Sequence, residues 1–213
     1  RMDVDMDRRN FLIAAGTSAG SLSMGAGSVV ANASVTQAGK GRKKPAVIRG
    51  AFVYPPTESL RKVGYYSWPG STFDAEGRQE QYMGRLREIE RKLGVRIEMD
   101  ETPLDEEASV NRFIADVKKS KPAGLLLIPF KKGHWPHVMR ILDETEMPSV
   151  VLATIGILLA PHIESIHKKK GVYFINSLDN LDAVEYGIRA IKTAHWMKNG
   201  RIVNLARSKH ATT

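Results

Sequence analysis

The sequence predicts an α/β fold, an open and mostly parallel sheet with helices on both faces in three layers. Two observations predict it. From residue 46 onward, short continuous apolar runs alternate with longer segments whose apolar residues recur every three or four positions. The run Gly124–Phe130 is apolar throughout, as expected of a central parallel strand that helices cover on both faces. Repeated alternation of this kind builds parallel sheets through right-handed crossovers.

Each strand is predicted by a short apolar run. The first spans Ala46–Tyr54, and the second, Val95–Met99, follows the helix stop at Gly94. The run Gly124–Phe130 is the third, and the fourth and fifth are similarly apolar. A sixth is predicted just before the chain ends. The last three strands span residues 148–154, 172–176 and 202–206.

Each helix is predicted by apolar residues at helical spacing. In residues 76–93 that face consists of Tyr82, Leu86, Ile89 and Leu93. The other three helices have equivalent faces and span residues 106–119, 134–146 and 180–198. Trp135 lies on the apolar face of its helix, which favours a place in the core.

Composition favours a globular protein. The apolar content of 42% and the charged content of 26% are near the averages of folded domains, so a packed core is expected. The formal charge of +9 is concentrated locally, in residues 40–44 and 168–170, and no nucleic-acid reading motif occurs. We therefore expect no nucleic-acid partner. The absence of cysteine excludes disulfides and thiolate chemistry.

The N-terminus carries a twin-arginine export pattern. Arg8 and Arg9 are followed after one position by Phe11 and Leu12, and a weakly apolar, glycine-rich stretch comes next. Ala31 and Ala33 then supply a small-x-small cleavage site. The stretch is too polar for a stable membrane anchor. We expect residues 1–33 to be a signal peptide that the twin-arginine translocase recognises, and the mature protein to be periplasmic.

Three segments follow from this organisation. Residues 34–45 are rich in Ser, Thr, Gly, Lys and Arg and are predicted to be a flexible linker. Residues 46–213 form the α/β domain. Because the chain opens with Arg1 and stops at Thr213 just after an apolar run, we expect a piece of a longer protein whose domain is truncated at its C-terminus.

A ligand site is expected beyond the carboxyl ends of the parallel strands, where open α/β sheets bind their ligands. The loops after strands one, three and five place aromatic rings beside short polar and charged side chains. Rings can stack on the C–H faces of a sugar while polar groups bond its hydroxyls. The ligand-binding residues predicted there are Trp68, Phe73, Asp74, Lys132, His134 and Asn176. Gly133, Ser177 and Asp179 are open to a purely structural interpretation as turn and cap residues.

The sequence lacks the motifs of several well-defined classes of binding and catalytic site. No G-x-G-x-x-G follows the first strand and no phosphate-binding loop occurs. His134 and His137 are three positions apart without a third ligand, so no metal site is predicted. No G-x-S-x-G supports a hydrolase triad. We assign no catalytic residue and no cofactor to this chain.

The order of the strands and of the glycine and proline residues beside them resembles that of a known family. Gly94–Met99, Ala123–Pro129 and Met147–Leu152 resemble the N-terminal lobe of type I periplasmic sugar-binding proteins, which is a flavodoxin-like sandwich. Asn176–Leu205 is similar to the stretch in which those proteins approach their second lobe. The stretch Leu125–Trp135 is similar to exported members of the fucose and arabinose isomerase-like proteins, whose N-terminal domain has the same architecture.

This resemblance implies two functional hypotheses. The first is the N-terminal sugar-binding domain of an exported sugar isomerase-like protein. Such isomerases use Mn²⁺ or Mg²⁺, held by residues of later domains, so the resemblance implies that this fragment alone is inactive. The second is a solute-binding receptor that delivers a sugar to a transporter and does no chemistry. Either protein can form oligomers.

Overall fold

The computed structural model describes residues 44–63, 73–153, 158, 160–177 and 179–200. The predicted export signal with Arg8, Arg9, Phe11 and Leu12, the cleavage site at Ala31 and Ala33, and the linker up to residue 43 lie outside the described residues. The predicted sixth strand, residues 202–206, also lies outside them.

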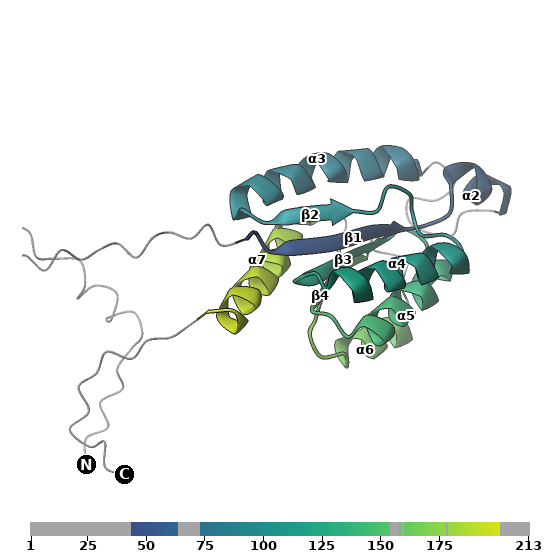
Figure 1. The fold of residues 1–213 in the computed structure, drawn as a ribbon. Coiled ribbons are helices and arrows are strands. Elements are labelled where there is room, and N and C mark those ends of the chain that lie inside the picture. Colours follow the sequence, from purple (N-terminus) through teal and green to yellow (C-terminus); the bar gives the residue numbers. More distant parts are fainter. Residues whose placement is uncertain (1–43, 64–72, 154–157, 159, 178, 201–213) are drawn as a thin grey trace, which may run out of the picture. The chain divides into compact units, whose positions relative to one another are not determined.

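The described residues form an α/β fold, which confirms the predicted class (Figure 1). Its sheet has five strands in the order β2-β1-β3-β4-β5, and all neighbours are parallel. The third strand is central, and all six of its residues are buried, as its apolar run predicts. The strands are β1 (Val47–Val53), β2 (Arg96–Met99), β3 (Gly124–Pro129), β4 (Ser149–Ala153) and β5 (Val172–Asn176).

Helices cover both faces of this sheet. The apolar sides of α3 (Ala75–Leu93) and α7 (Leu181–Lys198) pack into the core on one face. The core on the other face is covered by α4 (Glu107–Ser120), α5 (Trp135–Thr145) and α6 (Ala160–His167). Figure 1 shows α4, α5 and α6 gathered on the side of the sheet opposite α3. Buried Trp135 confirms the core position predicted for it.

Three short elements are absent from the sequence prediction. These are α2 (Thr57–Val63), α6 and a 3-10 turn, η1 (Lys132–His134), that precedes α5. Each is at most eight residues long, so it offers too few turns for an apolar stripe to emerge in the sequence. The four longer helices and the five described strands begin and end within about two residues of their predicted limits.

The ends of α3 show how local sequence sets these limits. Asp74 precedes the helix, and its carboxylate accepts a hydrogen bond of 3.0 Å from the backbone N–H of Gly77. This cap satisfies one of the free N–H groups of the first turn. Gly94 ends the helix in the left-handed conformation, with φ at 60°, which glycine adopts without steric cost.

Two buried carboxylates link neighbouring elements of the fold. Asp100, at the end of β2, accepts hydrogen bonds from Arg49 of β1 at 3.3 Å and from Arg112 of α4 at 3.0 Å. Glu185 of α7 pairs with Lys92 of α3 at 2.9 Å. Both carboxylates are buried, and each has a cationic partner, as burial of a charge requires. Within the described part of the chain, no helix combines the length and apolarity that crossing a membrane would need.

Candidate functional site

The strand order places a crevice at the carboxyl end of β1. The chain leaves β1 through α3, on one face, to reach β2, and it returns to β3 through α4, on the opposite face. The segments that follow β1 and β2 therefore diverge to opposite faces of the sheet. In open parallel sheets, ligands bind at this change of direction.

A cavity of about 390 Å³ lies at this edge. It is bounded by the segments after β1 and β2 and by the first turns of α3 and α4, which all meet at the carboxyl end of the sheet. Its volume suits a small organic ligand. The lining residues are Tyr54, Pro56, Glu76, Gln79, Thr102, Pro103, Asp105, Glu106 and Ser109.

Asp105 connects the cavity to the loop after β3. Its carboxylate lies 2.8 Å from Nε2 of His134, although the two residues are 29 positions apart in the chain. Burial lowers the pKa of His134, and the opposing effect of Asp105 is smaller. The imidazole is therefore neutral near pH 7, where it donates its Nε2 proton to Asp105. The carboxylate of Asp105 is held in place and keeps acceptor capacity for a ligand.

His134 also has an unused acceptor. Its Nδ1 atom is buried and has no hydrogen-bond partner among the described residues. A neutral imidazole that donates from Nε2 leaves a lone pair on Nδ1. The ring therefore contributes a single directed hydrogen bond, to Asp105, and is otherwise packed against the ring of His137, with centroids 5.3 Å apart.

The hydroxyl of Tyr54 is one of the polar groups at the cavity. It donates to Oε1 of Gln79 across 2.8 Å. Burial raises the pKa of this hydroxyl, and the nearby carboxylates of Glu76 and Asp74 raise it further. The group therefore stays protonated at any physiological pH and can only hydrogen-bond, not act as a base.

Glu76 is held ionised at the cavity wall. Burial raises its pKa, but hydrogen bonds from Thr57 and from the backbone of Glu76 itself together outweigh burial, so the net pKa lies below the ordinary value. The backbone N–H of Thr57 donates to Oε1 at 2.9 Å and its hydroxyl donates to Oε2. These bonds also attach α2 to the start of α3, which shapes this side of the cavity.

Glu106 and Ser109 form the opposite wall at the start of α4. The hydroxyl of Ser109 accepts from the backbone N–H of Glu106 at 3.2 Å and donates to its carbonyl oxygen at 2.7 Å. The side chain of Glu106 is exposed. Its carboxylate takes part with Ser109 in the capping box of α4 and stays accessible to a ligand that enters the cavity.

The structure brings one predicted residue to the cavity, His134, through its bond with Asp105. Asp74 is the cap of α3. Phe73 is buried and makes an edge-to-face contact with Phe130. The centroids of the two rings are 5.4 Å apart. Lys132 is exposed within η1.

Of the remaining two predicted residues, the structure describes only Asn176, which lies away from the cavity. Asn176 is exposed at the end of β5, on the far side of β3 and β4 from β1, about 14 Å away at ordinary strand spacing. Trp68 lies outside the described residues.

Sequence reasoning missed most of the cavity. It placed the predicted ligand-binding residues in the loops after strands one, three and five and not in the segment after strand two. That segment holds Thr102, Asp105 and Glu106. The signal was present, because two consecutive carboxylates directly before a helix stand where this rule places a ligand. Tyr54, the residue after β1, carried the same signal.

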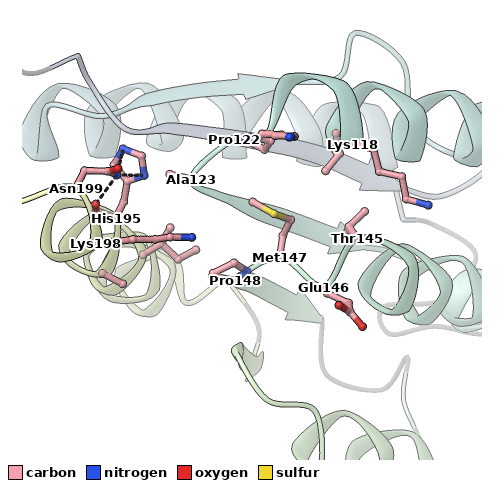
Figure 2. Close-up of a pocket in the computed structure, with 14 residues that line it drawn as sticks. Lys118, Pro122, Ala123, Thr145, Glu146, Met147, Pro148, His195, Lys198 and Asn199 are labelled. Atoms are coloured by element: carbon pink, nitrogen blue, oxygen red, sulfur yellow. Dashed lines mark hydrogen bonds between the residues drawn. The ribbon is translucent and has the colours of Figure 1, made fainter.

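A larger cavity, of about 630 Å³, lies at the opposite edge of the sheet (Figure 2). It is bounded by the last turns of α4, α5 and α7, with Met147 and Pro148 between them. Lys118 and Lys198 lie in the last turns of α4 and α7, where they offset the partial negative charge of the helix ends. We do not assign the ligand site here, since parallel sheets bind ligands at their carboxyl edge.

No group of three or more histidine, aspartate or glutamate side chains in the described ranges is arranged to hold a metal ion. The geometry thus offers a small cavity with carboxylate, amide and hydroxyl groups. Comparison with known proteins adds no further assignment: the chain matches no protein-family model, and no curated protein is similar enough in sequence to count as a relative.

Proposed function

We propose that this domain binds a monosaccharide in the cavity at the carboxyl end of β1. The observation that carries the proposal is the cavity itself, about 390 Å³ in volume and lined by hydrogen-bonding groups of both kinds. Gln79 offers its amide N–H groups, Thr102 offers a hydroxyl, the hydroxyl oxygen of Tyr54 offers an acceptor, and carboxylates complete the wall. A sugar needs both donors and acceptors, because each of its hydroxyls is both.

Asp105 is the strongest single anchor in this proposal. A carboxylate that accepts from a sugar hydroxyl forms a charge-assisted hydrogen bond, which is about twice as strong as a neutral one. The bond from His134 fixes the orientation of this carboxylate before the ligand arrives. Less conformational entropy is then lost on binding.

We propose further that the domain belongs to an exported sugar isomerase-like protein. The residues that support this are the twin-arginine pattern and the stretch Leu125–Trp135. In that protein this domain would bind the sugar, while later domains would hold Mn²⁺ or Mg²⁺. A transport receptor is the alternative, in which the same cavity would bind the sugar without a metal.

The sugar proposal predicts ligand-induced stabilisation of the full-length mature protein. In a thermal-shift screen of aldoses, ketoses and polyols, at least one monosaccharide should raise the melting temperature, because a ligand of the folded state stabilises it by mass action. Substituting Asp105 with alanine should weaken that binding by about 1.5–3 kcal/mol, the worth of a hydrogen bond to a charged group. Titration calorimetry measures this loss directly.

The matched control is Asp116→Ala, which removes an exposed carboxylate further along α4 and should leave sugar affinity unchanged. A sugar shift that requires Mn²⁺ or Mg²⁺ would support the isomerase-like protein, and a metal-independent shift would support the receptor. Absence of a shift with every sugar would contradict the proposed function.

Substitution of the arginine pair tests the proposed export route. Replacing Arg8 and Arg9 with lysine in the full-length precursor should abolish transport, because the translocase recognises the pair itself and not its charge. Fractionation followed by immunoblotting should then find the precursor in the cytoplasm. Unchanged periplasmic yield of the doubly substituted protein would rule out this route.

A further inference from the structure

The cavity at the carboxyl end of β1 has an unbalanced charge. Glu76, Asp105 and Glu106 line it, and no lysine or arginine is among the described residues that line it. This is unusual in a chain whose formal charge is +9. The imbalance concerns the ligand-binding cavity proposed above, so any ligand selectivity inferred from it rests on that proposed function.

Buried carboxylates elsewhere in the described part of the chain have cationic partners. Asp100 is held between Arg49 and Arg112, and Glu185 between Lys92 and Arg189. The fold therefore places a cation where a carboxylate loses water. Among the described residues that line the cavity, no lysine or arginine takes that place.

The cavity carboxylates receive uncharged donors instead. Glu76 accepts from the backbone and hydroxyl of Thr57, and Asp105 accepts from the neutral imidazole of His134. No described lysine or arginine forms an ion pair with Glu76, Asp105 or Glu106. Their charges are balanced by water in the free protein, since Glu76 and Glu106 are exposed and Asp105 keeps 35% of its side-chain surface.

Helix ends offset only part of this charge. Glu76 lies in the first turn of α3, and Glu106 directly precedes α4. The start of a helix carries a partial charge of about +0.5, so the two helices together contribute about +1. Against three carboxylates, a charge of about −2 remains. A ligand that fills the cavity displaces the water that screens this charge, so an uncharged ligand would leave it uncompensated.

We infer that the cavity selects a monosaccharide that carries a protonated amine, an amino sugar. Its hydroxyls would bond Gln79 and Thr102, and its ammonium group would supply the positive charge that the described lining residues do not place beside the carboxylates. Three rotating N–H donors suit carboxylates arranged around a cavity, because an ammonium does not demand a planar geometry. The same wall would repel uronates and sugar phosphates.

The test compares sugars that differ at one substituent. Titration calorimetry of the full-length mature protein would use galactose, galactosamine, N-acetylgalactosamine and galacturonate, and the corresponding glucose and mannose series. In at least one series, the free amine should bind at least about tenfold more tightly than the neutral parent, as a partly solvated charge interaction allows. Acetylation should abolish the advantage, and the uronate should not bind.

Substitutions localise the effect. Glu106→Gln keeps the size of the side chain and removes one charge, so the ratio of the affinity for the amine to the affinity for the neutral parent should fall several-fold. Glu76→Gln should act in the same direction. Asp116→Asn removes the same charge about 15 Å further along the same helix, at 1.5 Å per residue, and should leave the preference unchanged.

The outcomes separate this inference from the proposed function. If no sugar of any series binds, the proposed function fails. If neutral sugars bind as tightly as the amines, the domain still binds sugars, but the inference of amine selectivity is wrong. An amine preference that survives both Glu106→Gln and Glu76→Gln would also overturn it, because the recognising charge would then lie elsewhere.

Discussion

Replacing Phe130 with alanine should lower the free energy of unfolding by about 3–5 kcal/mol, the range for removal of a large aromatic side chain from a packed core. Phe130 directly follows β3 and is fully buried. Its ring is packed against those of Phe52, Tyr54, Phe73 and Tyr82, with centroids 5.2 to 5.9 Å away. The four neighbouring rings cannot all move in to fill the cavity that loss of the Phe130 ring would leave.

Equilibrium denaturation in urea measures this loss. Tyr186→Ala is the control, because it also removes an aromatic ring but from a side chain that is 60% exposed, and it should cost less than about 1 kcal/mol. Sugar affinity should fall together with stability in the Phe130 variant, since Tyr54 lines the cavity and loses its support. A change below that of the Tyr186 variant would contradict the packing described for this cluster.

Gly124→Ala should destabilise the protein by about 1–3 kcal/mol, the usual cost of overpacking a core. A Cβ atom at this position would lie 2.5 Å from the carbonyl oxygen of Pro148 and 2.7 Å from Cγ2 of Ile191. That oxygen accepts the hydrogen bond from the N–H of Leu125 at 2.9 Å. Relief of the clash therefore requires β3 and β4 to separate at their start, which breaks the ladder.

Gly84→Ala is the matched control in α3. Nothing lies within 4 Å of a Cβ atom there, and the position is exposed within the helix. Alanine should raise the stability by about 0.5–1 kcal/mol, because it restricts the unfolded chain and favours the helix. Urea denaturation of both variants should thus give changes of opposite sign. Equal effects would show that β3 and the start of β4 are not in such close contact.

Part of the candidate site followed from sequence reasoning. The carboxyl-end rule led to His134, which the structure places against Asp105. The same rule also selected Phe73 and Asp74, whose environments differ from expectation for physical reasons. Phe73 is more stable within the aromatic cluster than at a water-filled cavity, and Asp74 satisfies the free N–H of Gly77. Composition of a loop does not distinguish a ligand contact from a core ring or a cap.

Local sequence by itself determined the element order and the parallel sheet. Apolar runs and helical spacing depend only on neighbouring residues, so they could be read before any tertiary contact was known. The buried run Gly124–Phe130 even identified the central strand. Asp74 and Gly94, at the two ends of α3, act on backbone groups within a few positions of themselves.

Tertiary structure alone decided the strand order and the composition of the cavity. Asp105 and His134 meet although 29 residues separate them, because β1 lies between β2 and β3 and the loops that follow those two strands converge over its end. Which strands become neighbours depends on how whole helix faces pack, and no local pattern encodes it. The imbalance of charge in the cavity is a property of that convergence, since its three carboxylates come from two segments that only the fold brings together.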